Sequence, residues 1–487
     1  MSSETPGYRL INLRSPAPAA PACGNGPLGP YREMIALAWP QALMMLAQYC
    51  VALADVVVTG HIGTQAQAAL GLISVSVFCF LVTAMALANA ALAIISQSLG
   101  AGLARRSRRY AGFFLLLAMG VGLAFTLTFS QASAVFLRLL RIPDELLPMT
   151  ESFLGVYLYA LPAYYLLLIT NAIFQAHGLV RVPLCSMCLV AALNAVLDFG
   201  LGLGLWGFPA LGCRGVAWAT FGSVAAGALL NLSRLHFRGL LHAAEYPPVR
   251  WMRRSWRHVF RYAWPAGASQ LAWQGSSLAL CVILGSLPGD PVGPLAGFAA
   301  GVRVEALLTM PAYALGLAAA ILVGRALGSG DPCLSRAIAL RFLSLGVAAL
   351  TLAAVALWHL RQPLAFLVAQ NPVSQANMLQ YLNYSLAVSP FTVGAIILSG
   401  VLSGAGANRY SLACFVVAGW LVRLPLAWLL SQAGGLGARG VWFALCVSQV
   451  FHCLSLLFVV YARNWQGFAM SPARRSPYRL SRADRLA

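Results

Sequence analysis

Three carboxylic acids, Asp55, Asp198 and Glu305, lie inside long apolar stretches of the sequence. Ionising an acid at the centre of a bilayer costs about 2.5 kcal/mol or more, so acids in such stretches usually mark an ion or substrate pathway. A desolvated carboxyl group beside a second acid binds a proton readily and releases it when water or another cation arrives. These three residues are therefore candidates for ion-coupling chemistry.

Asp55 and Asp198 are expected to lie at the same depth in the membrane. Each follows a proline by fifteen residues, Pro40 and Pro183 respectively, and both helices are expected to start on the cytoplasmic side. At about 1.5 Å per residue, both carboxyl groups lie roughly 22 Å along their helices. Asn194 precedes Asp198 by one helical turn and shares its face, so it is a candidate for the same site.

Other polar residues in the apolar stretches suggest a substrate cleft. Glu305 is a candidate for binding a substrate cation, or else a structural acid that ties two helices together. Gln48, Gln270 and Gln274 are further candidates for lining the cleft. Pro40 interrupts the helical hydrogen-bond ladder, which predicts either a fixed kink or a bend that responds to the charge of Asp55.

The elements that position these residues are transmembrane helices. Hydrophobic residues make up 60% of the 487 residues and charged residues only 9%, whereas soluble domains carry about 25% charged residues. A helix needs roughly 20 apolar residues to cross a bilayer. The expected fold class is an all-α integral membrane protein, with twelve transmembrane helices at residues 33–60, 66–100, 110–136, 149–178, 183–206, 213–236, 258–286, 294–327, 337–360, 376–405, 410–431 and 438–462.

The basic residues are distributed as membrane topology requires. The formal net charge is +20, yet the chain has no Lys, and its 32 Arg form short clusters between apolar runs. With both termini in the cytoplasm, most Arg lie on the inside, as the positive-inside rule requires. These clusters suit anionic lipids, whereas nucleic-acid binding needs a basic face on a folded domain. Membrane lipids are the expected partners, and nucleic acid is not.

The sequence carries no pattern of a metal site or of a cleaved signal peptide. The 11 Cys are scattered, mostly inside apolar runs, and the 7 His stand singly. The first thirty residues lack the charged start and apolar core of a signal peptide. No metal or cofactor is expected, and the N-terminal segment is predicted to be a disordered cytoplasmic tail.

An internal repeat divides the chain into two halves. Ala38-Trp39-Pro40 recurs as Ala263-Trp264-Pro265 at an offset of 225 residues, and Leu99-Gly100-Ala101-Gly102 recurs as Leu327-Gly328-Ser329-Gly330 at an offset of 228. Two six-helix halves that both start inside are parallel repeats, an arrangement typical of secondary transporters. The predicted organisation is a disordered cytoplasmic tail at 1–32, an N-terminal bundle at 33–236, a cytoplasmic linker at 237–257, a C-terminal bundle at 258–463 and a basic cytoplasmic tail at 464–487.

The repeat also bears on the alternative that Asp55 and Asp198 are structural. At the offset of 225, Asp55 aligns with Leu280 and Asp198 aligns with Arg423. The second half is expected to fold without these acids, so the fold does not require them. A functional role is therefore favoured.

Several motifs, in order along residues 33–463, resemble the multidrug and toxic compound extrusion (MATE) family. They are Leu37-Ala38-Trp39-Pro40, Ala54-Asp55, Asn194-Ala195-Val196-Leu197-Asp198, Gly215-Val216-Ala217-Trp218-Ala219-Thr220, Arg303-Val304-Glu305, Met310-Pro311, Arg423-Leu424-Pro425 and Gly440-Val441-Trp442. Asp55 and Asp198 lie in the first bundle, as in the DinF-like branch, and Gln270 and Gln274 are the only strongly polar candidates for a site in the seventh helix.

The resemblance implies two bundles in a V and a secondary antiporter in the inner membrane. It implies that small amphipathic compounds, lipophilic cations above all, leave the cell in exchange for protons or sodium, of which protons are favoured. Asp55, Asp198, Asn194 and Thr220 would then form the coupling site, with Pro40 as a bending point. A monomer is expected.

Two other function classes remain as alternatives. A flippase for lipid-linked oligosaccharides shares the two-bundle plan, but it would favour a strongly cationic cavity, and only Arg303 and Arg423 lie well inside the predicted helices, away from their ends. An integral membrane enzyme would need a nucleophile with a base, or a metal constellation. No such set stands out in the sequence, so we do not expect an enzyme.

Overall fold

The computed structural model describes residues 29–139, 146–241, 247–288, 292–368 and 372–470, and every regular element in these ranges is a helix. The elements of the first half are α1 (Gly29–Ile62), α2 (Thr64–Gly100), α3 (Ala104–Leu139), α4 (Leu147–Ala176), α5 (Arg181–Leu197), η1 (Asp198–Gly202), η2 (Leu205–Gly207) and α6 (Cys213–Phe237). Those of the second half are α7 (Val249–Gly285), α8 (Val292–Gly328), α9 (Pro332–Val368), α10 (Pro372–Ala405), α11 (Asn408–Val416), η4 (Val417–Arg423), α12 (Leu424–Trp428), η5 (Leu429–Ala433), α13 (Ala438–Ala462) and η6 (Gln466–Phe468).

The twelve predicted spans correspond to twelve helical rods, because α5 continues into η1, and α11, η4, α12 and η5 follow one another without a break. Eleven rods within the described ranges are long and apolar enough to cross a membrane. The exception is α7, whose first turns carry Arg residues and whose later turns carry Gln270 and Gln274. Helices suit this setting because they satisfy every backbone polar group within one segment.

Most helices begin a few residues earlier than the sequence predicts, and α7 differs most. Helix α1 starts at Gly29, and α7 starts at Val249, inside the segment 237–257 that was predicted to be a linker. The extension of α7 is held by aromatic packing, since the Trp251 ring meets the Tyr110 ring edge-on at 4.8 Å between centroids. The predicted tails at 1–28 and 471–487, and the linker residues 242–246, lie outside the described residues.

The backbone repeats with the sequence. Gly178 and its counterpart Gly406 both have φ of +77°, and the pair Gly212 and Gly437 have φ of +57° and +56°. Such left-handed conformations are cheap only for glycine. These glycines occupy the turns that end or start helices, so each half folds its chain in the same way, as the predicted repeat requires.

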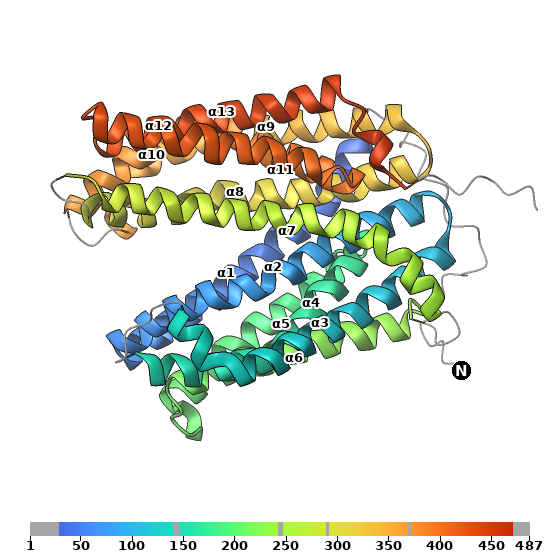
Figure 1. The fold of residues 1–487 in the computed structure, drawn as a ribbon, viewed down its shortest axis with the longest axis horizontal. Coiled ribbons are helices and arrows are strands. Elements are labelled where there is room, and N and C mark those ends of the chain that lie inside the picture. Colours follow the sequence, from blue (N-terminus) through green and yellow to red (C-terminus); the bar gives the residue numbers. More distant parts are fainter. Residues whose placement is uncertain (1–28, 140–145, 242–246, 289–291, 369–371, 471–487) are drawn as a thin grey trace, which may run out of the picture.

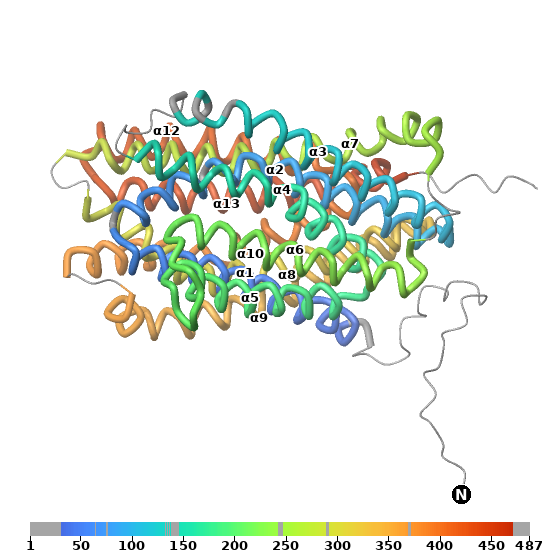
Figure 2. Tube along the Cα trace, turned by 90° about the horizontal axis from the view of Figure 1, so that it is seen from below, coloured from blue at the N-terminus to red at the C-terminus, as the bar shows by residue number. Residues whose placement is uncertain are grey.

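The two halves form two bundles that diverge from a common end (Figure 1). Helices α1 to α6 make one bundle and α7 to α13 the other. Across the boundary, α1 contacts α8, and α2 contacts both α7 and α8. The start of α1 and the short helix η6 lie at the same end of the long axis (Figure 2). We call this end the terminal end.

Glycines bring the two halves into backbone contact at the terminal end. A Cβ added at Gly100 of α2 would lie under 3.0 Å from the carbonyl oxygen of Arg325 in α8. A Cβ added at Gly328 of α8 would lie equally close to the carbonyl oxygen of Gln97 in α2. Gly100 and Gly328 are repeat counterparts, so the same close backbone approach occurs twice, once with a glycine from each half.

Hydrogen bonds reinforce this contact. The Gln97 Nε2 of α2 donates to the carbonyl oxygen of Gly404 in α10 at 2.8 Å. The Gln97 Oε1 accepts from the Tyr262 hydroxyl of α7 at 3.2 Å and from the backbone N–H of Met470 at 2.9 Å. Arg325 donates across the boundary to the carbonyl oxygen of Ala176 at 2.9 Å, at the C-terminus of α4. In the state described here the two halves are therefore closed at the terminal end.

Candidate functional site

The predicted coupling residues meet inside the first bundle, where four elements each contribute one side chain. Asp55 comes from α1, Asn194 from α5, Asp198 from the first residue of η1 and Thr220 from α6. Asp198 is fully buried and Asp55 is 9% exposed. The segment η1 is a π-helical turn, a widened turn that is often found at functional sites. We call these four residues the acid cluster.

Contacts within the acid cluster link all four elements. The Asp55 carboxyl group interacts with the side chains of Asp198 and Asn194. The Asn194 amide donates to the Thr220 hydroxyl at 3.4 Å, and that hydroxyl donates in turn to the carbonyl oxygen of Val216 at 3.0 Å. The equal depth predicted for Asp55 and Asp198 therefore corresponds to a direct approach of their carboxyl groups.

The acid cluster is short of hydrogen-bond donors. Both carboxyl oxygens of Asp198, one of Asp55 and the amide oxygen of Asn194 are buried with no hydrogen-bond partner of regular geometry among the described residues. Buried oxygens of this kind are costly unless they are satisfied, and two adjacent carboxylates cannot both ionise cheaply. The arrangement suits a proton or a cation that is shared among these oxygens.

Two tyrosines of α4 complete the surroundings of the acids. Tyr157 and Tyr164 both lie within electrostatic range of Asp55 and Asp198, and the Tyr157 hydroxyl lies 3.3 Å from the Thr220 hydroxyl. These two tyrosines are not among the residues that the sequence predicts for the site. Their spacing of seven residues, which puts two side chains on one helix face, is the signal that could have linked them.

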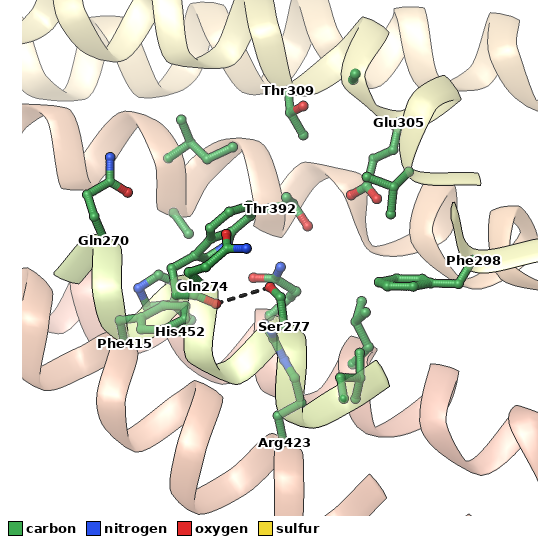
Figure 3. Close-up of a pocket in the computed structure, with 18 of the residues that line it drawn as sticks. Gln270, Gln274, Ser277, Phe298, Glu305, Thr309, Thr392, Phe415, Arg423 and His452 are labelled. Atoms are coloured by element: carbon green, nitrogen blue, oxygen red, sulfur yellow. Dashed lines mark hydrogen bonds between the residues drawn. The ribbon is translucent and has the colours of Figure 1, made fainter. Parts of the chain in front are cut away.

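A cavity of about 710 Å³ occupies the second bundle. Figure 3 shows Gln270, Gln274 and Ser277 approaching it from α7, and Glu305 and Arg423 entering it from different helices. Its aromatic lining includes Trp273, Phe298, Tyr381 and Phe415. The mixture of apolar walls with a few polar groups is typical of sites for small organic molecules.

The cavity lies where the acid cluster lies in the other half. Leu280, Arg423 and Leu445, the residues at an offset of 225 from Asp55, Asp198 and Thr220, all line it. Arg423 ends the π-helical segment η4, as Asp198 begins the π-helical turn η1. The same place in the repeat thus holds a carboxyl group in one half and a guanidinium group in the other.

Glu305 and Arg423 each have a different partner. The Tyr381 hydroxyl donates a hydrogen bond to Glu305, and the Arg423 Nε donates to the Ser448 hydroxyl at 2.9 Å. The two side chains attract each other electrostatically, but they form no ion pair within the described part of the chain. The cavity therefore presents an acid and a guanidinium group on separate elements.

The remaining predicted residues fall into two groups. Gln270 and Gln274 line the cavity together with Glu305, whereas Gln48 is exposed on α1 and is not part of the cavity lining. Helix α1 continues through Pro40, which is buried, so a bend at this proline remains a prediction. Across the described ranges, no group of three or more His, Cys, Asp or Glu side chains could hold a metal ion.

Comparison with known proteins decides the family. The MatE family profile matches residues 40–199 and 265–429, which is more than half of the chain. The two matched stretches start at counterpart residues, Pro40 and Pro265. The chain belongs to the MatE family. It is a multi-pass membrane transporter and not an enzyme, as the sequence predicted.

Individual relatives of this MatE protein cover nearly its whole length. It is 27% identical to a probable multidrug resistance protein NorM of Bradyrhizobium diazoefficiens, over 89% of this chain and 94% of the relative. It is 26% identical to a protein of Shewanella oneidensis named as an FAD transporter, over 88% and 93% of the two chains. The fold matches a solved outward-facing MATE transporter with a TM-score of 0.81 and 20% identity, over 88% and 95% of the chains. The predicted V-shaped MATE fold is confirmed, and membership of the DinF-like branch stays a prediction.

Proposed function

We propose that this MatE transporter is a secondary active exporter of small amphipathic organic compounds, multidrug in type, that exchanges them for protons across the inner membrane. The acid cluster is the coupling site, and the second-half cavity binds the exported compound. The observation that carries the proposal is the burial of Asp198 with both carboxyl oxygens unpartnered beside the Asp55 carboxyl group.

A single bound proton explains both the adjacent carboxyl groups and the missing hydrogen-bond donor of the acid cluster. One proton bound between Asp55 and Asp198 removes the repulsion of two adjacent carboxylates and supplies a donor to an oxygen that has none. Sodium is the second candidate, because hard cations take carboxylate and amide oxygens as ligands. Asn194 Oδ1, buried without a partner, could serve as such a ligand.

The multidrug type is supported by the relatives and by the chemistry of the cavity. The Bradyrhizobium relative is named a probable multidrug resistance protein, and an apolar cavity with aromatic walls binds by surface burial, which gives loose recognition. The relative named as an FAD transporter makes a dedicated exporter the second candidate. The flippase alternative is not favoured, because the described residues that line the cavity include a single Arg, Arg423.

Proteoliposomes test the coupling. Purified protein with an imposed pH gradient should move an amphipathic dye, and a sodium gradient alone should not. Asp55→Asn and Asp198→Asn should each abolish gradient-driven transport, since the amide cannot carry the coupling proton. Asp331→Asn is the matched control, because Asp331 caps the exposed start of α9 through the Leu334 N–H, and Asn caps a helix equally well.

Two results would overturn the proposal. Gradient dependence that persists in both acid-cluster variants would remove the acid cluster from the mechanism. Transport driven equally by sodium at constant pH would replace the proton by sodium at the same oxygens.

The proposed topology has both termini in the cytoplasm, as the Arg distribution favours. Reporter fusions within residues 1–32, 237–257 and 464–487 should all report the cytoplasm. Any one of the three reporting the outside would refute this orientation.

A further inference from the structure

Arg423 is a buried cation without a countercharge in contact. It is 5% exposed, and its only hydrogen bond to a described residue runs from Nε to the Ser448 hydroxyl. Its terminal guanidinium nitrogens form no hydrogen bond with any residue that the structure describes, although the side chain lines the cavity. A buried charge is costly unless it is paired, so this geometry calls for an anionic partner.

Two more buried polar groups in the cavity lining have unused hydrogen-bonding capacity. Thr392 of α10 and His452 of α13 are 7% and 8% exposed. The Thr392 Oγ1 and the His452 Nε2 have no hydrogen-bond partner among the described residues. His452 is also one turn from Ser448 on the same face of α13 and lies within electrostatic range of Arg423.

Glu305 does not neutralise Arg423 in the described state. It accepts the hydrogen bond of the Tyr381 hydroxyl and forms no ion pair with the guanidinium. The terminal nitrogens of Arg423 thus remain available to a ligand.

We propose that the second-half cavity recognises aromatic compounds through an oxyanion group, a carboxylate or a phosphate, which Arg423 binds with its terminal N–H groups. A guanidinium matches a planar carboxylate or a phosphate with two parallel hydrogen bonds. The aromatic body of the compound packs against the rings of Phe298 and Phe415, which line the same cavity. This inference rests on the proposed function, whose substrate class it specifies.

The test uses four dansyl probes that share one fluorophore and differ in charge. They are dansylglycine, its uncharged amide dansylglycinamide, the phosphate ester of dansylaminoethanol, and the amine dansylcadaverine. Binding to the purified full chain in detergent is followed by the rise in dansyl fluorescence, without any ion gradient. The wild-type protein should bind dansylglycine more tightly than dansylglycinamide, and the phosphate ester shows whether the second oxyanion is accepted.

Variants assign the preference to one side chain. Arg423→Gln should weaken the binding of dansylglycine by about 10- to 100-fold, as loss of a charge-assisted pair predicts, and leave dansylglycinamide unchanged. Arg423→Lys should keep part of the preference for dansylglycine, because Lys retains the positive charge but cannot make the two parallel hydrogen bonds of a guanidinium. Arg409→Gln is the matched control, since Arg409 is exposed, stacks on Trp264 and does not line the cavity.

The outcomes separate this inference from the proposed function. A wild-type protein that binds dansylglycinamide or dansylcadaverine as tightly as dansylglycine overturns the inference. This comparison uses only the wild-type protein, so it does not depend on whether a variant folds. An equal preference in Arg423→Gln and the wild type overturns it as well. Asp198→Asn should keep the preference for dansylglycine while it loses gradient-driven transport, so a failure of the coupling proposal leaves the binding result interpretable.

Discussion

Gly100→Ala should open the terminal end of the molecule. The added methyl group would meet the backbone carbonyl of Arg325 at less than 3.0 Å, and backbone cannot rotate away as a side chain can. The clash exists only while α2 and α8 are in contact. Overpacking of this kind costs about 1–3 kcal/mol, so the ratio of closed to open molecules should fall by about 5- to 150-fold.

A cysteine reporter measures this shift. Ser96 is fully buried on α2, and its Cβ lies 3.0 Å from the position that a Cβ on Gly324 of α8 would take. In an otherwise cysteine-free chain, Ser96→Cys should react slowly with a water-soluble maleimide and considerably faster when Gly100→Ala is added. Gly328→Ala should act in the same way, because it meets the carbonyl oxygen of Gln97 in the same contact.

Gly71→Ala supplies the control for helix propensity. Gly71 also lies in α2, and no atom lies within 4 Å of its added Cβ. Alanine stabilises a helix relative to glycine by roughly 0.5–1 kcal/mol at either position, so only the steric effect differs. Labelling at Ser96→Cys that is the same in Gly100→Ala and Gly71→Ala would refute the assignment of the α2–α8 contact as a closed gate.

Three further predictions follow from single contacts. Tyr262→Phe removes the hydroxyl that bridges Gln97 and the Phe468 carbonyl, so labelling of the same reporter should rise by less than in Gly100→Ala, consistent with about 0.5–1.5 kcal/mol for one hydrogen bond. Asp198→Asn should leave the thermal unfolding midpoint unchanged or higher, because its buried oxygens have no donors to lose; a clear drop would show a structural role. Glu305→Gln should weaken the binding of dansylcadaverine more than that of dansylglycine, and equal losses would exclude Glu305 from charge recognition.

Much of the fold could be predicted from the sequence because a membrane narrows the options. Backbone groups in lipid must be satisfied within one segment, so a long apolar run specifies a helix with few alternatives. The repeat then fixed the relation of the halves, since Gly178 and Gly406 need the same left-handed turn. The start of α7 was mispredicted, because its Arg-rich first turns carry no apolar run and are held by Trp251 packing on a distant helix.

The candidate site was predictable only in part. Counting residues from Pro40 and Pro183 placed Asp55 and Asp198 at one depth, and the structure brings their carboxyl groups together. The sequence could not show which way Gln48 faces, because apolar helices border both the lipid and the central cavity. The π-helical turns add a further obstacle, since an extra residue in a turn rotates every later side chain relative to a regular helix. His452 and Thr392 lie on the α-helices α13 and α10 and were missed for another reason: nothing in their own stretches of sequence distinguishes a cavity face.

The two halves share a backbone plan and differ in the charge at one counterpart position. Among the described residues, the carboxyl oxygens of Asp198 have no hydrogen-bond donor of regular geometry, and the terminal nitrogens of Arg423 have no acceptor. The proposed sites for ion binding and compound binding thus lie in separate bundles, which meet closely at the terminal end around Gly100 and Gly328. If the bundles move as rigid bodies, that contact is the element whose equilibrium both sites bias. A substitution at Gly100 should then disturb ion coupling and compound release together, whereas one at Arg423 should disturb compound selection alone. The difference between the effects of these two substitutions follows from the positions of Gly100 and Arg423 in the fold, and it does not depend on which compound is carried.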